Sequence, residues 1–376
     1  MKKPKPDYSL KEVVSAPPYC TNPLCRWHDP EISAVEGQFS KQGSRPVTRF
    51  PYVTKRYACK RCGKGISDSF FHLFYRDRTE STYGEILHAL TKNKNKIATA
   101  EDLGCSLDTV QRRFRKLASQ GLLIQAKKTE QLKIRESIAY DGIENFAFSQ
   151  FDPNNINHAI GRDSFFLYDF NYAPLNRKGR MSNFQVRKKR RIENKFGAYP
   201  KDAIRTTTRK IISRLLERTE GELLFHSDKH FMYRDAIASL PDRKRIKHLI
   251  TPAKVARNFR NRLFAINHCD LLTRQRLAPF KRETVSHAKH SIAMVESFSI
   301  HMVVKNFLRS VFLKKHKRNP TTNSESPAMR VGIETKILTF QEFYRIRYVK
   351  TQVKLNEDWL NFVNRVDPYS RRKIAS

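Results

Sequence analysis

The chain has 376 residues, and its 73 lysines and arginines outnumber its 36 aspartates and glutamates, which gives a net charge of +37. A compact protein this basic repels itself unless it binds an anion, and nucleic acid is the natural partner because phosphate binding releases counterions. An anionic membrane surface and an acidic protein are the alternatives. The sequence has no run of about 18 apolar residues to cross a membrane, no apolar signal-peptide core, and too few cysteines for a disulfide scaffold. We therefore expect a cytoplasmic protein that handles DNA or RNA and does not contact a membrane.

Four of the six cysteines form two close pairs, Cys20 with Cys25 and Cys59 with Cys62. The spacings Cys-x4-Cys and Cys-x2-Cys let two thiolates of one turn bind the same tetrahedral Zn²⁺. The sequence predicts a structural zinc ribbon over residues 1–75, with these four ligands and a strand leading to the second pair. Four unrelated buried cysteines are the alternative.

The other cysteines and a nearby histidine receive no metal role. His28 could replace a ligand, but four thiolates suffice, so we expect it at the surface. Cys105 and Cys269 are isolated and are expected to behave as small apolar residues.

Residues 76–130 are predicted to form a helix-turn-helix DNA-binding domain. A first helix is expected over residues 82–90, a left-handed turn at Gly104, and an N-cap at Ser106 for a helix that buries apolar residues at helical spacing. The polar side chains of this last helix that are expected to reach the major groove and its phosphates are Gln111, Arg112, Arg113, Arg115 and Lys116. An ordinary helical hairpin with a solvated basic face is the alternative.

From residue 131 onward the pattern changes to an α/β arrangement. The strands are expected over residues 138–146, 164–172, 221–228 and 245–250. The helices are expected over residues 203–217, from about Phe264, and over residues 291–308. A basic loop that includes Arg187–Arg191 is expected between the second strand and the first helix, and residues 351–376 are expected to form a basic C-terminal tail.

Two acids lie on the predicted strands. Asp141 belongs to the first strand, and Asp228 ends the third. Carboxylates at strand ends can converge on two divalent metals, which stabilise the attacking and leaving oxygens of phosphoryl transfer, and Mg²⁺ suits such oxygen ligands. The alternatives are a turn at Asp141–Gly142 and a helix N-cap at Asp228.

The order of a zinc ribbon, a helix-turn-helix, a strand-borne Asp and a strand ending in Ser-Asp resembles a bacterial insertion-sequence transposase of the DDE type. Residues 263–274 and 281–284 are similar to the block around the third catalytic residue of such enzymes, and residues 319–329 resemble their later tail. The resemblance implies a multi-domain α/β protein with a ribonuclease-H-like catalytic domain over residues 131–350. It also implies Mg²⁺ or Mn²⁺ at the acids, cleavage and strand transfer of double-stranded DNA, a homodimer, and a bacterial, nucleoid-associated location.

The third acid departs from the family pattern. Asn267 and Asp270 lie on one helical face somewhat farther beyond Asp228 than the family's Glu does. Asp270 supplies a carboxylate and is the predicted third catalytic residue, with Asn267 and Glu296 as alternatives. Another acid, Glu283, lies between Asp270 and Glu296 in the sequence.

Two other functions remain open. One is a non-catalytic transcriptional regulator with the same DNA-binding parts, and the other is a metal-dependent nuclease that does not join strands. The basic runs at Arg187–Arg191 and Lys314–Arg318 are expected to contact backbone phosphates or to lack structure, and Arg371–Lys373 is expected to fray.

Overall fold

The computed structural model describes residues 16–32, 37–48, 50–79, 82–281, 285–312 and 325–370. The chain divides into two compact units, and each unit is assembled from separate stretches of the sequence. The first contains residues 1–89, 96–130 and 338–355, and the second contains residues 90–95, 131–337 and 356–376. The predicted features at Glu283, Lys314–Arg318 and Arg371–Lys373 lie outside the described residues, as does part of the segment 319–329.

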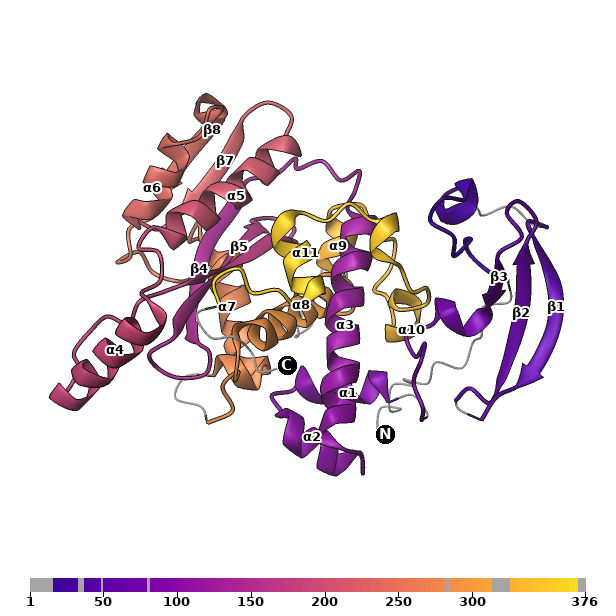
Figure 1. Cartoon of the computed structure of the whole chain (residues 1–376). Coiled ribbons are helices and arrows are strands. Elements are labelled where there is room, and N and C mark those ends of the chain that lie inside the picture. Colours follow the sequence, from indigo (N-terminus) through magenta and orange to yellow (C-terminus); the bar gives the residue numbers. More distant parts are fainter. Residues whose placement is uncertain are drawn as a thin grey trace, which may run out of the picture. The chain divides into compact units, whose positions relative to one another are not determined.

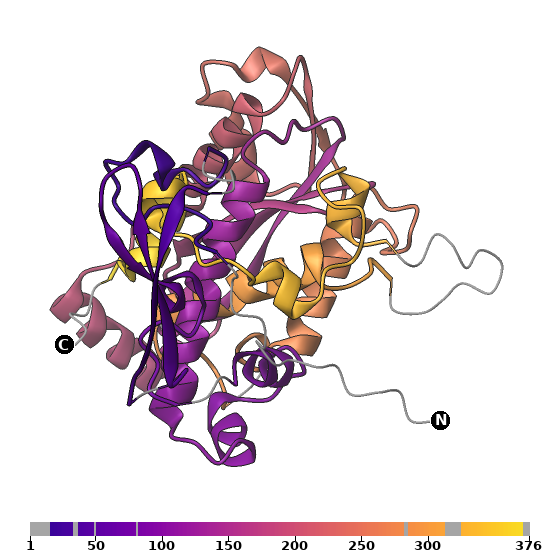
Figure 2. The ribbon, with the colours of Figure 1, turned by 90° about the vertical axis from the view of Figure 1, so that its right-hand side faces the viewer.

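A three-stranded antiparallel sheet opens the first unit (Figure 2). Strands β1 (Phe39–Pro46), β2 (Val53–Cys59) and β3 (Gly65–Ser67) lie in that order, and β2 confirms the strand predicted before the second cysteine pair. Tyr19 and Phe71 pack edge to face beside this sheet with ring centroids 4.9 Å apart, and both are fully buried.

Three helices follow in the first unit: α1 (Tyr83–Leu90), α2 (Lys96–Asp102) and α3 (Leu107–Lys128). Gly104 has φ +57°, in the left-handed region where a side chain would be strained, and this conformation ends the turn after α2. Ser106 then caps α3 by accepting a hydrogen bond from the Thr109 N–H at 3.2 Å. The first helix, the turn and the cap are confirmed as predicted.

A segment from late in the sequence completes the first unit. It carries α10 (Phe340–Phe343), and the Tyr344 hydroxyl donates to the Leu117 carbonyl on α3 at 3.2 Å. Gln120 and Tyr348 exchange two hydrogen bonds of 3.0 and 2.9 Å. The sequence predicts residues 338–350 as the end of the α/β domain and 351–355 as part of the basic tail, whereas in the structure they belong to the first unit and contact α3 through Tyr344.

The second unit contains a five-stranded mixed sheet (Figure 1). Its strands are β4 (Ile138–Phe146), β5 (Pro153–Gly161), β6 (Leu167–Pro174), β7 (Leu223–Ser227) and β8 (Ile246–Ile250), in the order β6-β5-β4-β7-β8. β4, β5 and β6 are antiparallel neighbours, whereas β7 runs parallel to β4 and β8 parallel to β7. β5 was missed from the sequence, because its asparagine-rich run disfavours a strand.

Helices cover both faces of this sheet. The longer helices of the second unit are α4 (Asn183–Phe196), α5 (Ala203–Glu217), α6 (Phe231–Ala238), α7 (Phe264–Arg276), α8 (Ser291–Phe307) and α11 (Glu357–Asn364), and the short α9 spans Pro327–Arg330. Of these, α4 does not lie on the sheet. Tyr140 of β4 points to α5, where its hydroxyl donates to Thr208 at 2.8 Å, so the next residue, Asp141, points to the opposite face. The region around Arg187–Arg191, predicted as a loop, is the helix α4. None of the described helices is both long and apolar enough to cross a membrane.

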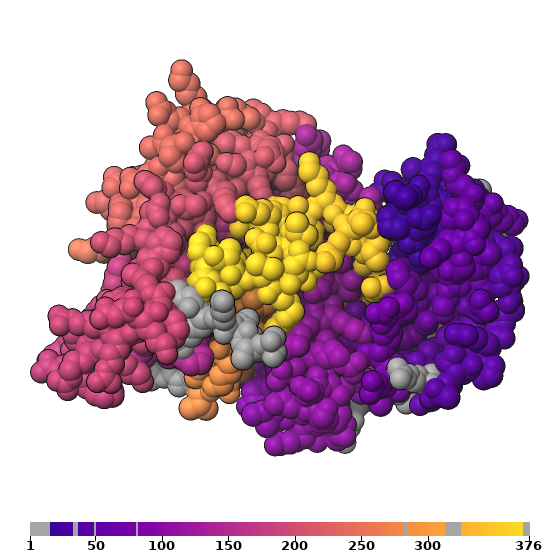
Figure 3. Space-filling view, viewed as in Figure 1, coloured from indigo at the N-terminus to yellow at the C-terminus, as the bar shows by residue number. Residues whose placement is uncertain are grey.

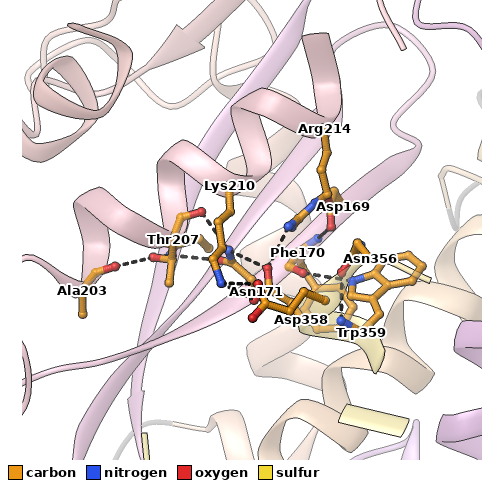
Figure 4. A network of polar contacts seen from close by, with 12 residues as sticks. Asp169, Phe170, Asn171, Ala203, Thr207, Lys210, Arg214, Asn356, Asp358 and Trp359 are labelled. Atoms are coloured by element: carbon orange, nitrogen blue, oxygen red, sulfur yellow. Dashed lines mark hydrogen bonds and ion pairs between the residues drawn. The ribbon is translucent and has the colours of Figure 1, made fainter. Parts of the chain in front are cut away.

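Helix α11 covers the edge strand β6, where the sequence predicted a basic tail. Asp358 of α11 accepts a 2.8 Å bond from Arg214 of α5, and the same guanidinium donates to Asp169 of β6 at 2.6 Å (Figure 4). The indole N–H of Trp359 donates to the Phe170 carbonyl at 3.1 Å. The helix forms here because its apolar face is buried against the sheet and its one buried acid finds a cation.

Candidate metal centre and acidic site

The four predicted zinc ligands come together in the first unit. Their sulfur atoms all lie within 4.8 Å of one another, with Cys20 to Cys62 at 3.5 Å and Cys25 to Cys59 at 3.9 Å. A tetrahedral zinc with bonds of about 2.3 Å requires sulfurs about 3.8 Å apart, so the cluster fits this ion. The four cysteines could therefore bind a metal such as zinc.

Tight turns present these sulfurs. The Cys25 N–H donates to the Asn22 carbonyl at 3.0 Å, and the Gly63 N–H donates to the Cys59 carbonyl at 2.8 Å. Burial raises the pKa of the Cys20 and Cys25 thiols above the ordinary value, which keeps both protonated when no metal is bound. A bound cation would displace these protons, because thiolates are the metal ligands.

His28 is buried, which corrects the prediction of a surface histidine. One ring nitrogen lies 2.8 Å from the Cys20 carbonyl, and the other lies 2.8 Å from the Thr351 hydroxyl. The ring therefore supports the first cysteine turn through its backbone. Of the isolated cysteines, Cys269 is buried, as expected of a small apolar residue, and Cys105 is half-buried.

Asp141 lies on β4, and Asp228 follows directly after β7, the parallel neighbour of β4 in the second unit. The pairing of Ile138 with Phe225 and of Ala139 with His226 sets an offset that, carried two residues further, relates Asp141 to Asp228. The β4–β7 pairing ends just before these two acids, so both carboxylates lie where the strands part.

Each acid also has a local role in the backbone. Asp141 lies inside β4, so the proposed turn at Gly142 is wrong. Gly142 leaves room for the Asn155 side chain, which would have to shift to make space for a Cβ at this position, 1.9 Å away. Asp228 accepts a 2.9 Å bond from the His230 N–H, but the N-cap of α6 (Phe231–Ala238) is His230, so the alternative of a cap at Asp228 is wrong.

The third acid, Asp270, reaches the same region from α7. Burial raises the pKa of Asp141 to about 7, with further contributions from the charges of Asp270 and Asp228. The carboxylates of Asp270 and Asp228 are therefore close enough for their charges to act on Asp141. Such crowding is costly without a cation and is typical of functional sites.

Asp270 is held by a histidine that the sequence did not single out. Its Oδ1 lies 3.1 Å from Nε2 of His158, which is fully buried on β5 opposite Asp141 in the antiparallel register. Burial opposes protonation of His158, but the adjacent Asp270 carboxylate outweighs this and raises the pKa of His158 well above its ordinary value. The Tyr233 hydroxyl of α6 lies 3.5 Å from Asp141 Oδ1. The only sequence signal for His158 was a histidine in a polar run whose strand was missed.

The two alternatives to Asp270 have different surroundings. Asn267 lies one turn earlier on α7 and is half-buried. Glu296 is buried on α8 and forms an ion pair with Arg365 just beyond α11. Glu296 thus already has a cation as a partner and is not among the groups that act on Asp141.

The three carboxylates of the acidic site are not close enough to one another to coordinate a single ion. In the described part of the chain, the four cysteines are the sole group of three or more Cys, His, Asp or Glu side chains close enough to hold one ion. The oxygen ligands of the acidic site suit a divalent cation in type, since Mg²⁺ takes carboxylates together with water and substrate oxygens.

The predicted DNA-reading face of α3 is partly wrong. Arg113 is 1% exposed, and its guanidinium donates to Thr79 and lies 3.7 Å from the buried Asp77. Lys116 donates to Asp77 at 2.7 Å, and Arg112 lies 3.4 Å from the same acid. These cations surround Asp77 because its buried charge needs partners.

Two of the five predicted DNA-binding residues, Gln111 and Arg115, are half-buried at the helix surface and lie 3.5 Å apart. Arg112 keeps 43% of its side chain exposed. The side chains of Gln111, Arg112 and Arg115 can still reach an external ligand. Arg113 cannot do so unless its buried contacts are broken.

Comparisons with known proteins do not identify the chain. No family model matches its sequence, and no curated protein matches it.

Proposed function

We propose that this chain is a DNA transposase of the DDE type, which binds the ends of a mobile element and catalyses metal-dependent cleavage and transfer of DNA strands. One observation carries the proposal. Asp141 on β4 and Asp228 just beyond the end of β7 lie next to the point where these parallel strands part, and the charges of Asp228 and of Asp270 on α7 act on Asp141. This arrangement supports a phosphoryl-transfer site more directly than a purely DNA-binding protein.

The order of the strands also supports a ribonuclease-H-like catalytic domain. Three antiparallel strands are followed by two parallel ones that add to the side of β4. Asp141 and Asp228 lie at the carboxyl side of the β4–β7 pairing, where ligands of open α/β sheets bind.

Asp141, Asp228 and Asp270 would hold Mg²⁺ or Mn²⁺. When bound, the metal supplies positive charge to the attacking and leaving oxygens of phosphoryl transfer. His158 orients the Asp270 carboxylate, and the fully buried position of its ring keeps that orientation fixed. The transfer needs no serine or tyrosine nucleophile, because a water and then a DNA 3′ hydroxyl attack the phosphorus.

The first unit would bind the DNA. In this proposal the four-cysteine cluster and its sheet form a zinc ribbon, and α2 and α3 form a helix-turn-helix with Gln111, Arg112 and Arg115 facing the duplex. A homodimer in the bacterial cytoplasm would hold two element ends together.

A cleavage assay tests this function. The substrate is a supercoiled plasmid that carries the coding sequence with its natural flanks, incubated with Mg²⁺. Asp141→Ala and Asp228→Ala should each abolish nicking, whereas Asp242→Ala, which changes an exposed acid of the same unit, should not. Unchanged cleavage by both acid variants would contradict the proposal.

The same assay separates the alternatives. Nicking without joined products in a target plasmid indicates a nuclease without strand transfer. Sequence-specific binding with no metal-dependent cleavage indicates a transcriptional regulator.

A further inference from the structure

Helix α4 of the second unit is a formed helix that has no buried residue. Its N-terminus is closed by a capping box, in which Ser182 and Gln185 exchange hydrogen bonds of 3.0 and 3.3 Å, and it ends at Gly197. Most helices in proteins are stabilised by packing an apolar face, so a helix held chiefly by its caps presents most of its surface to other molecules.

Hydrogen bonds join the chain segments that lead into and out of α4. The Asn176 amide donates to the Tyr199 carbonyl at 2.8 Å, and the Tyr199 N–H donates back to the Asn176 side chain at 2.9 Å. The Tyr199 hydroxyl donates to Asp152 in the β4–β5 turn at 3.2 Å. Figure 1 shows the helix projecting from the sheet of its own unit beyond these joined segments.

The charges of α4 are sorted onto one face. At 100° per residue, one continuous arc carries the exposed cations, which are Arg187, Lys188, Arg190, Arg191 and Lys195. The one acid of the helix, Glu193, lies on the opposite, half-buried side and pairs with Lys189 at 3.6 Å. The outer face therefore has five positive charges and no negative one, and Figure 3 shows the side chains of α4 forming the surface at the left of the view.

The positive charge of this face is suited to binding a polyanion. From Arg187 to Lys195 the helix rises about 12 Å, long enough to lie beside a few phosphates of a DNA duplex. The sole large apolar side chain exposed on α4 is Phe184. A helix that binds in a lipid surface needs a continuous apolar face, which α4 does not offer.

We propose that α4 is an arm that binds the phosphate backbone of double-stranded DNA without reading its sequence. The choice of DNA among polyanions rests on the proposed function. Phosphate contacts position a protein on the duplex and carry no sequence information, so the arm extends the grip of the catalytic unit to any DNA that lies beside it.

The test compares two variants that lose the same charge. Arg187, Arg190 and Arg191 are changed to Gln in one, and the exposed Arg243, Lys244 and Lys247 at β8 are changed to Gln in the other. Binding of a random-sequence 30-bp duplex is measured by fluorescence anisotropy without Mg²⁺ at several salt concentrations. Circular dichroism and thermal unfolding check that both variants fold like the parent.

The α4 variant should lose at least about tenfold in affinity at low salt, and its slope of log K against log salt should fall by about 2 to 3, since each phosphate contact contributes about 0.9. The β8 variant should retain most of the affinity and most of the salt dependence of the parent protein. An unchanged α4 variant, or an equal loss in the β8 variant, overturns the proposal. The proposal is also overturned if the α4 variant loses binding to phosphatidylserine vesicles while its DNA binding is unchanged.

The test is independent of catalysis. A parent protein that binds duplex through α4 but never cuts DNA supports the arm and removes the transposase assignment. A protein that cuts DNA normally and binds it equally well after the α4 change removes the arm alone.

Discussion

Asp141 and Asp228 are related by the register that pairs Ile138 with Phe225 on the parallel strands β4 and β7. This offset brings two acids from distant parts of the sequence to the end of the β4–β7 pairing, and the charges of Asp228 and of Asp270 on α7 both act on Asp141. Burial and these two charges raise the pKa of Asp141, so its ionised carboxylate has a cost for folding. That cost can be measured directly.

Asp141→Asn should stabilise the metal-free protein at pH 8. Burial and the charges of Asp270 and Asp228 raise the pKa of Asp141 to about 7, so at pH 8 the folded protein holds a carboxylate in an unfavourable place. An uncharged amide removes this cost, and we expect a gain of about 1 kcal/mol in the free energy of unfolding, measured with urea. Asp242→Asn serves as the exposed control, and a loss of stability in Asp141→Asn would contradict the crowding of charges.

The purified protein should contain about one zinc per chain, measured by inductively coupled plasma mass spectrometry. Cys59→Ser should lose most of this metal and lower the melting temperature, because a closed four-thiolate site contributes folding energy to the small sheet beside it. Cys105→Ser changes a cysteine outside the cluster and should keep the full zinc content. Equal zinc in both variants would mean that the sulfur cluster is not the metal site.

Asp358→Ala should destabilise the second unit by about 3 kcal/mol, because it removes one partner of a buried guanidinium (Figure 4). Glu357→Ala changes the neighbouring residue, whose side chain is 71% exposed and pairs with Lys210 at the surface. That variant should lose less than about 1 kcal/mol. Urea unfolding followed by the fluorescence of Trp359, which lies on the same helix, reports both changes.

Arg113 and Arg115 are two residues apart on α3 and should behave differently. Arg113→Ala should cost about 3 kcal/mol of stability, since it leaves the buried Asp77 with one fewer cation. Arg115→Ala should leave stability nearly unchanged and weaken DNA binding. Thermal unfolding and duplex binding measured on both variants separate a structural arginine from a DNA contact, and equal stability of the two would contradict the buried ion pair.

Three histidines should each reduce the free energy of unfolding as the pH is lowered from about 6.5 to about 4, against the opposite contribution of Asp141. Burial lowers the pKa of His72 to about 4, and it does the same for His226 and His268. Because the unfolded chain binds these protons near pH 6.5 and the folded protein does not, these histidines favour unfolding in acid over this interval. His72→Phe should make the dependence shallower, as measured by urea unfolding at half-unit steps of pH. A curve parallel to that of the parent would exclude His72 as a contributor.

Local signals in the sequence were sufficient for much of this fold. Gly104, Ser106 and the two cysteine pairs act over a few residues, and each occurs where the pattern predicts it. The apolar periodicity of α5 and α8 gave helices with nearly the observed bounds, because one face of each is buried.

The errors came from partners far apart in the sequence. Arg113 looks like an exposed base reader until Asp77 is known to lie beside it, and Asp358 looks like part of a charged tail until Arg214 is placed. The asparagines of β5 are poor strand formers alone, but Asn157 is satisfied by Thr207 on α5 at 2.8 Å. His158, the missed neighbour of Asp270, lies on that same strand.

The late segment also makes the folding of the first unit depend on residues far apart in the sequence. Tyr19 donates to the Arg347 carbonyl, and Gln120 is held by Tyr348, so this unit has unfilled positions until the residues beyond 338 have been synthesised. In the second unit, the edge strand β6 is likewise uncovered until Trp359 has been made. A chain cut short before residue 338 therefore leaves apolar surface exposed in both units, and we expect such a fragment to aggregate.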